Sequence, residues 1–134
     1  MTATSLVIDA DGLTKHYGRK VGCEEVCLRV RRGHIFGFLG PNGAGKSTFV
    51  KMMVGLIAPT SGRAEVLGRP LGDLGARTGI GFLPEVFRYQ DWLTASELLR
   101  LHGRLAGMES GAIAESSKRV LDLVGLKSQD SGKI

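Results

Sequence analysis

One glycine-rich run restricts the folds open to this chain more than any other feature of its sequence. The run reads Gly40, Pro41, Asn42, Gly43, Ala44, Gly45, Lys46, Ser47 and Thr48. The apolar residues 34–39 before it predict a buried strand. Residues 47–57 after it predict a helix, because Phe49, Met52 and Leu56 recur at helical spacing. A glycine-rich loop between a strand and a helix predicts an α/β fold.

The same run has the spacing of a phosphate-binding loop: a glycine, four residues, a glycine, a lysine, and a serine or threonine. Its glycines let successive backbone N–H groups face one phosphate, and the N-terminus of the following helix favours the same anion. Lys46 would reach the β- and γ-phosphate oxygens, and the Ser47 hydroxyl would bind Mg²⁺. The alternative is a glycine-rich turn that happens to contain a lysine. We predict a binding site for a nucleoside triphosphate with Mg²⁺ across residues 40–48.

Composition and charge exclude several other classes of protein. The 134 residues suffice for one small domain, and with 43% apolar and 23% charged residues the chain can form a core. It has neither an apolar run long enough to span a membrane nor a secretory signal, so we expect a cytoplasmic protein. The net charge is +5, and its densest cluster, Arg29, Arg31 and Arg32, is interpreted as a solvated turn. We expect no nucleic-acid partner.

Further elements are expected on both sides of the loop. Short strands are predicted at residues 6–8 and 23–30 before it, and at 62–67 and 79–83 after it, with a glycine-rich connection over 68–75. From there the pattern is helical to the end of the chain. Two residues are predicted as helix N-caps: Thr94, with Glu97 completing a capping box, and Ser110.

Two cysteines, Cys23 and Cys27, lie in one predicted strand. A separation of four residues places both on the same face, about 13 Å apart, which is too far for a disulfide. Because the chain has no CxxC motif and its three histidines are scattered, a zinc site is not expected. Reduced thiols in the core are predicted.

Several segments resemble the nucleotide-binding subunit of ABC transporters, and the resemblance extends from about Ile8 to Gly125. They are LTKHYG at 13–18, RGHIFGFLGPNGAGKST at 32–48, MVGLIAPTSG at 53–62 and IGFLPE at 80–85. The resemblance implies an α/β P-loop NTPase fold of the ABC ATPase type. It implies an N-terminal antiparallel strand layer with a partial parallel core over about residues 1–86. Residues 87–134 would begin the helical subdomain.

The resemblance also implies roles for single residues. Tyr17 matches the position of an aromatic residue that stacks on adenine, although a tyrosine there can also serve packing alone. Glu85 stands at the Q-loop position, where the family usually has glutamine; a carboxylate suits Mg²⁺ equally well, and the alternative is an exposed loop acid. Phe87, Tyr89 and Trp92 lie where the helical subdomain receives a membrane partner, and they could form a docking surface or a local core.

By this resemblance the chain would be the ATP-binding component of an ABC transporter, coupling MgATP binding and hydrolysis to transport. A transmembrane permease subunit and a second ATP-binding subunit are the expected partners, at the inner face of the membrane. The family's signature motif, Walker B strand, D-loop and switch histidine would follow Gly125, and none lies within the 134 residues. We therefore expect an incomplete ATPase domain that does not hydrolyse ATP alone. The alternatives are a non-catalytic ATP-binding remnant or regulatory fragment, and part of a soluble ABC ATPase that acts on nucleic acid or ribosomes.

Overall fold

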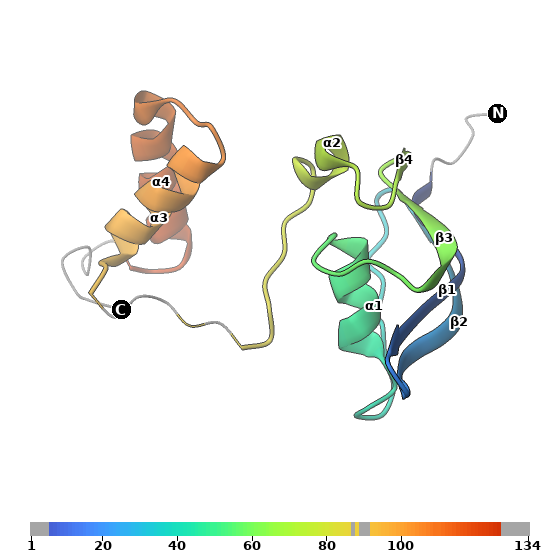
Figure 1. The fold of residues 1–134 in the computed structure, drawn as a ribbon. Coiled ribbons are helices and arrows are strands. Elements are labelled where there is room, and N and C mark those ends of the chain that lie inside the picture. Colours follow the sequence, from blue (N-terminus) through green and yellow to red (C-terminus); the bar gives the residue numbers. More distant parts are fainter. Residues whose placement is uncertain (1–5, 87, 89–91, 127–134) are drawn as a thin grey trace. The chain divides into compact units, whose positions relative to one another are not determined.

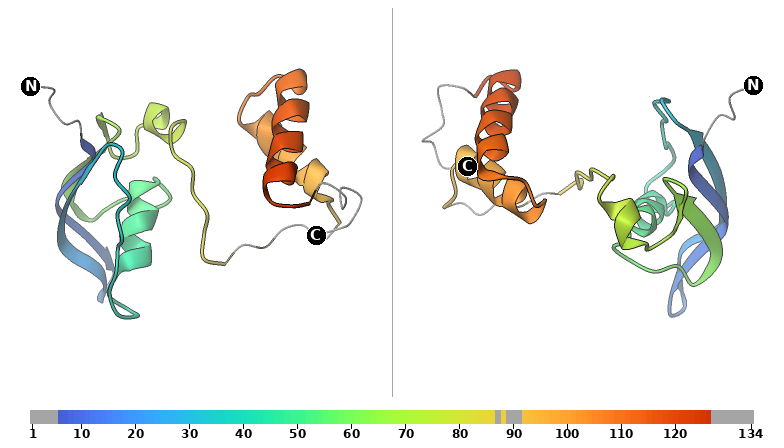
Figure 2. Two further views of the ribbon diagram at one scale, coloured as in Figure 1. Left: turned by 180° about the vertical axis from the view of Figure 1, so that it is seen from behind. Right: turned by 90° about the horizontal axis from the view of Figure 1, so that it is seen from above.

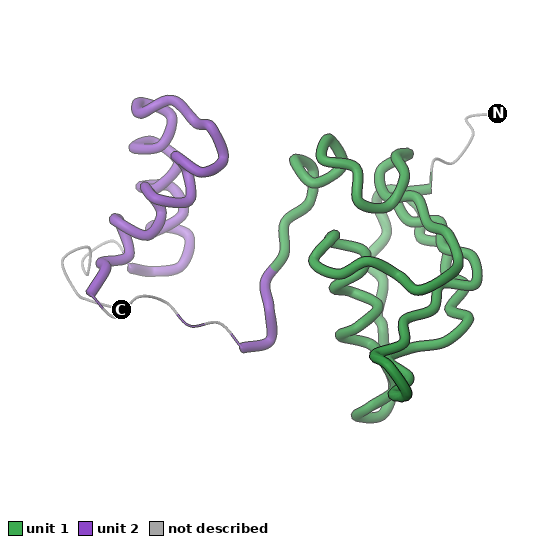
Figure 3. Tube along the Cα trace, in the orientation of Figure 1, with its two compact units in different colours: residues 1–82 green, residues 83–134 purple. Residues whose placement is uncertain are grey.

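The computed structural model describes residues 6–86, 88 and 92–126. These residues belong to two compact units, one reaching to Phe82 and the other beginning at Leu83 (Figure 3). Each unit has its own secondary structure, so the two are described in turn. None of the helices in the described parts of the chain is long and apolar enough to cross a membrane.

The first unit contains a four-stranded antiparallel sheet (Figure 1). Its strands are β1 (Leu6–Tyr17), β2 (Lys20–Arg31), β3 (Ser61–Val66) and β4 (Arg69–Pro70), in the order β2-β1-β3-β4. A tight turn joins β1 to β2, with Gly18 at φ +59°. The expected antiparallel strand layer is therefore present, and its first two strands are twelve residues each, longer than the sequence pattern indicated.

Helix α1 (Lys46–Met53) packs against one face of this sheet, as both views in Figure 2 show. Its apolar stripe meets the inward side chains of three strands to form the core of the unit. The buried residues of this cluster are Ala10, Leu13, Cys23, Phe49, Met52, Met53, Ala64 and Val66. On the strands, Asp9 pairs with Arg29 at 3.1 Å and Asp11 pairs with Arg63 across neighbouring strands. All four of these charged side chains are partly or largely exposed. One face of the sheet is thus apolar and covered by the helix, while cross-strand ion pairs remain accessible to solvent.

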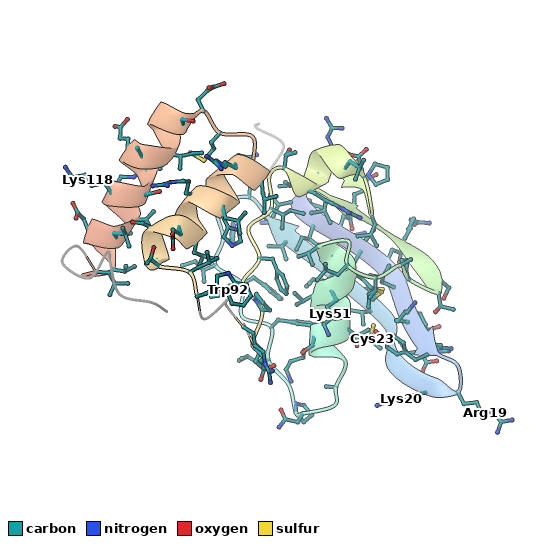
Figure 4. The ribbon with its side chains drawn as sticks, turned by 60° about the vertical axis from the view of Figure 1, so that its left-hand side comes forward. Arg19, Lys20, Cys23, Lys51, Trp92 and Lys118 are labelled. Carbon is teal, nitrogen blue, oxygen red and sulfur yellow. The ribbon has the colours of Figure 1, made fainter. Side chains whose placement is uncertain are left out.

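A bulge in β2 corrects the expectation that both cysteines share one face. Glu25 adopts φ +47°, and the residue pairing with β1 shifts between Cys23 and Val26. The extra residue reverses the alternation of side chains beyond it. Cys23 therefore lies buried on the side that faces α1, where Figure 4 labels it, whereas Cys27 is exposed. Both thiols are free, as predicted, but only Cys23 belongs to the core.

Two predicted strands, at residues 34–39 and 79–83, are not strands in the structure. Both segments are irregular, and in the first Ile35 and Leu39 are almost fully exposed, with relative residue exposures of 105% and 91%. Apolar character alone does not make a strand, because a strand needs hydrogen-bonded neighbours. All strand pairs among the described residues are antiparallel, so the expected partial parallel core is not formed by them.

Smaller corrections concern the ends of elements. Helix α1 ends at Met53 rather than Ile57, because Gly55 turns left-handed at φ +72° and Leu56 N–H donates to the Lys51 carbonyl oxygen at 2.8 Å. The connection predicted over 68–75 contains β4 and the start of a short helix, α2 (Leu74–Arg77).

The second unit is a pair of helices, α3 (Ala95–Leu105) and α4 (Ser110–Leu123). They meet closely where Gly103 faces Ile113: a methyl group on Gly103 would lie 2.7 Å from Ile113 Cγ1. The predicted capping box at α3 is confirmed, since Thr94 Oγ1 accepts from Glu97 N–H and Glu97 Oε2 accepts from Thr94 N–H. The prediction for α4 was wrong by one residue: Glu109 is the N-cap and Ser110 is the first helical residue.

Replacing Thr94 by alanine should destabilise the second unit by about 1 kcal/mol, because the first turn of α3 loses its side-chain acceptor. Urea unfolding followed by Trp92 fluorescence and helical circular dichroism measures this change. Ser110→Ala is the matched control, since Ser110 is inside α4 rather than at its cap, and it should change stability by less than about 0.5 kcal/mol. Equal effects of the two substitutions would contradict this account of the cap.

Candidate functional site: the glycine-rich loop

The glycine-rich run forms the connection between the irregular segment 34–39 and helix α1. Phe38 anchors this segment on the helix: its ring centroid lies 5.2 Å from that of Phe49, whose side chain is buried. Ala44 N–H donates to the Pro41 carbonyl oxygen at 3.3 Å, which closes a turn inside the loop. Phe49 N–H donates to the Gly45 carbonyl oxygen at 2.9 Å, which starts the helix at once. The loop thus leads directly into the N-terminus of α1.

Two glycines of the loop are required by its backbone conformation. Gly43 and Gly45 both adopt φ +84°, in the left-handed region that residues with a Cβ avoid. Gly45 also packs tightly against β2. A methyl group on Gly45 would lie 2.3 Å from the Gly22 carbonyl oxygen and 2.7 Å from Cys23 Cβ. The start of α1 can therefore approach β2 this closely only because residue 45 has no side chain.

The electrostatics of the loop favour an anion. Gly45 is the N-cap of α1, so no side chain caps the first turn, and that turn contains no acidic residue. The first N–H groups of a helix have no partner within it and carry partial positive charge. Lys46 Nζ lies over the loop, where it donates to the carbonyl oxygens of Gly40 and Pro41, at 2.7 Å in each case. The Lys46 ammonium and the unpaired N–H groups of the first turn thus lie together at the N-terminal end of α1.

Two hydroxyl residues follow the lysine on α1. Ser47 is exposed in the first turn, and Thr48 is half-buried with its methyl group directed towards Gly22 of β2. A methyl group on Gly22 would lie 3.0 Å from Thr48 Cγ2. Ser47 is therefore available as an oxygen ligand, whereas the Thr48 side chain packs the helix onto the strand.

Tyr17, the last residue of β1, is brought close to the loop by the same glycine of β2. A methyl group on Gly22 would lie 2.8 Å from Tyr17 Cε2 as well as beside Thr48. The tyrosine remains 46% exposed, so its ring is only partly packed. Lys15 Nζ lies 5.5 Å from the centroid of this ring. Tyr17, Gly45 and Thr48 therefore all border Gly22 in the first unit.

Glu85 is the remaining predicted site residue. It lies in the second unit, in an irregular segment, and its side chain is exposed. Of the aromatic residues predicted near it, Trp92 is 70% exposed, while Phe87 and Tyr89 lie outside the described residues. The role of Glu85 as a Mg²⁺ ligand stays a prediction.

Sequence reasoning missed two residues that shape the site, Gly22 and Cys23. A glycine inside a strand often marks a close approach of another backbone, and Gly22 does so here for the loop, Tyr17 and Thr48. Burial raises the pKa of the Cys23 thiol above its usual value, partly offset by a hydrogen bond with the Lys15 backbone, which keeps the group neutral behind the loop. The Gly22–Cys23 pair is the surface on which the loop rests.

The groups in this loop suit a phosphate. The first turn of α1 has no side-chain cap, Gly43 and Gly45 are left-handed, and the Lys46 ammonium lies over the loop. For a metal, Ser47 offers one hydroxyl oxygen, and no three histidine, cysteine, aspartate or glutamate side chains cluster as a metal site in the described ranges. A bound Mg²⁺ would thus take most of its ligands from the phosphates and water, as this ion commonly does.

Comparisons with known proteins identify a family to which the chain is similar. The ABC transporter family profile matches residues 23–134. The chain is 43% identical over 129 residues to the probable multidrug ABC transporter ATP-binding protein YbhF of Escherichia coli K12, covering 95% of the chain and 22% of that protein. It is 36% identical over 130 residues to the Nod factor export ATP-binding protein I of a Bradyrhizobium strain, covering 96% of the chain and 43% of that protein. The chain thus spans less than half the length of either relative.

Solved structures give the same result for the fold. An ATP-binding subunit of an ABC transporter superposes with a TM-score of 0.81 at 28% identity, covering 95% of this chain and 54% of the other. A dimeric ATP-binding cassette in a post-hydrolysis state with ADP and phosphate superposes with a TM-score of 0.78 at 23% identity, covering 94% and 61%. The expected P-loop fold of the ABC ATPase type is thereby confirmed.

Replacing Gly45 by alanine should disrupt the packing of the loop on β2 more than the same change at Gly43. Both substitutions strain a left-handed residue by about 1 to 2 kcal/mol. Only Gly45→Ala also places a methyl group against β2, because nothing lies within 4 Å of the added group at Gly43. Hydrogen exchange of the β1 and β2 amides measures the free energy of opening. Equal protection in the two variants would contradict the close approach described here.

Proposed function

This chain belongs to the ABC transporter family, whose profile matches residues 23–134, and from that membership we propose that it is the ATP-binding part of a transporter's ATPase subunit. The observation that carries the proposal is the geometry of residues 40–48. Left-handed glycines, an uncapped helix N-terminus and the Lys46 ammonium occupy one loop, beside an aromatic ring at Tyr17. The ligand that needs both a phosphate cradle and an aromatic platform is a nucleotide.

In the proposed complex the triphosphate lies along the loop. The N–H groups of the first turn of α1 bind the β-phosphate, and Lys46 turns from the loop carbonyl oxygens to the β- and γ-phosphate oxygens. Ser47 would hold Mg²⁺, which would offset the negative charge of these phosphates. Tyr17 stacks on adenine, supported by its partial exposure and its place at the end of β1. Glu85 is the proposed Q-loop residue and a further Mg²⁺ ligand.

The proposed physiological role is to couple MgATP binding and hydrolysis to transport. It rests on the names of the relatives, which describe ATP-binding proteins of a multidrug transporter and of Nod factor export. We infer a transmembrane permease subunit and a second ATP-binding subunit as partners, with the protein at the cytoplasmic face of the membrane. Residues from about 87 onwards are proposed to begin the subdomain that contacts the permease.

If the loop holds MgATP, Lys46→Ala should weaken nucleotide affinity by about 1.5 to 3 kcal/mol, or roughly ten- to a hundred-fold, because a charge-assisted phosphate contact is lost. Titration with a fluorescent ATP analogue in the presence of Mg²⁺ measures this change. Lys51→Ala is the matched control: it removes the same charge from an exposed position of the same helix, labelled in Figure 4. Equal affinities in wild type and Lys46→Ala would show that the loop is not the nucleotide site.

We further propose that the 134-residue polypeptide binds ATP without hydrolysing it above the uncatalysed rate. Phosphoryl transfer needs an oriented water and stabilisation of charge on the γ-phosphate, and the loop supplies only the phosphate cradle. Phosphate release from the purified polypeptide should equal that of a buffer blank. Release that disappears in Lys46→Ala would contradict this expectation. It would also assign the water-positioning role to an acid within these residues, with Glu85 the first to test.

A further inference from the structure

We propose that Lys15 is a positioning residue that holds the Tyr17 ring in place for the nucleotide base, an inference that rests on the proposed nucleotide function. Lys15 and Tyr17 are separated by one residue on β1, and alternate residues of a strand point to the same side. The Lys15 ammonium lies 5.5 Å from the centroid of the Tyr17 ring. This separation is within the range of a cation–π interaction.

The Lys15 ammonium is also held by a hydrogen bond to the backbone. Lys15 Nζ donates to the Ala58 carbonyl oxygen at 2.7 Å, in the connection between α1 and β3. This connection is itself attached to β1: Thr60 N–H donates to the Thr14 carbonyl oxygen at 2.8 Å, and His16 N–H donates to Thr60 Oγ1 at 3.0 Å. The Lys15 side chain therefore links β1 to the connection between α1 and β3, and these two segments are hydrogen-bonded to each other. Its ammonium is thereby held beside the Tyr17 ring.

The Tyr17 ring is restricted on a second side by β2. Its Cε2 atom lies so close to Gly22 that a methyl group there would be 2.8 Å away. The ring is thus bounded by the lysine ammonium and by the strand, yet 46% of the residue remains exposed. A side chain already confined loses less conformational entropy when a base stacks on it. Lys15 would therefore strengthen binding of the base while leaving the phosphates to the loop.

The test compares two ligands that share the phosphates and differ in the base. Affinities for MgATP and for Mg²⁺ tripolyphosphate are measured by calorimetry on the full 134-residue chain and its variants. Lys15→Met removes the charge and keeps most of the stem, whereas Lys15→Arg keeps a cation that can also interact with an aromatic face. Lys51→Met controls for the loss of one positive charge from an exposed site in the same unit. Tyr17→Ala, alone and with Lys15→Met, completes a double-mutant cycle.

Lys15→Met should weaken MgATP binding about three- to ten-fold and leave tripolyphosphate binding unchanged beyond the small effect of Lys51→Met. Lys15→Arg should bind both ligands as the wild type does. In the Tyr17→Ala background, Lys15→Met should add no further loss, because the residue acts through the ring. If Lys15→Met does not fold, Lys15→Gln replaces it in the same cycle, since glutamine is uncharged and keeps an N–H donor.

Three results would overturn the inference: unchanged MgATP affinity, an equal loss for the two ligands, or a loss that adds fully to that of Tyr17→Ala. The last two would mean that Lys15 supports the fold or the overall charge rather than the ring. A wild-type chain that fails to bind MgATP at all would contradict the proposed nucleotide function, and the inference would fail with it. The two failures are therefore distinguished by the wild-type titration.

Discussion

The contact of Gly45 with β2 is the constraint on which the rest of the site depends. A strand backbone and a helix N-terminus meet there with no room for a methyl group between them. This contact joins the antiparallel layer to α1 at the point where the helix dipole and Lys46 act. Because Gly22 also borders Tyr17 and Thr48, a two-residue stretch of β2 positions the phosphate loop and the aromatic ring together. The residues proposed to bind the base and the phosphates thus share one support, and a change in β2 would affect both.

In the first unit the acidic side chains of β1 are paired with arginines, and the first turn of α1 has no acidic residue. Acidic side chains on β1 are paired across strands, Asp9 with Arg29 and Asp11 with Arg63. The start of α1 carries no acid, and its nearest buried titratable group, Cys23, is kept neutral by burial, which raises its pKa. No carboxylate in the first turn of α1 therefore neutralises the Lys46 ammonium or the positive partial charge of the helix N-terminus. This end of the helix therefore favours an anion, as the proposed triphosphate site requires.

Features set by neighbouring residues were predictable from the sequence, and features set by distant partners were not. The capping box of Thr94 and Glu97 needs only three residues of separation, and the phosphate loop is specified by its own glycines. The segments 34–39 and 79–83 have the composition of buried strands, but strand formation depends on partners elsewhere, and neither is paired. The face of Cys27 was mispredicted because strict alternation was assumed, whereas Glu25 introduces an extra residue with a left-handed backbone. No short sequence pattern predicts such a bulge.

The aromatic ring proposed to stack on the base, that of Tyr17, illustrates the same limit and its physical reason. Tyr17 could be proposed from the resemblance to the ABC transporter family, yet nothing in the sequence indicates that Gly22, Lys15 and Ala58 determine where its ring lies. Gly22 restricts the ring through the absence of a side chain, and Lys15 does so from a distance of 5.5 Å while bound to a carbonyl 43 residues away. These are contacts between strands and a returning connection, which exist only once the sheet is assembled. The residues of a binding site can thus be recognised from a short stretch of sequence. Their geometry, and hence the proposed affinity for the base, depends on the assembled sheet.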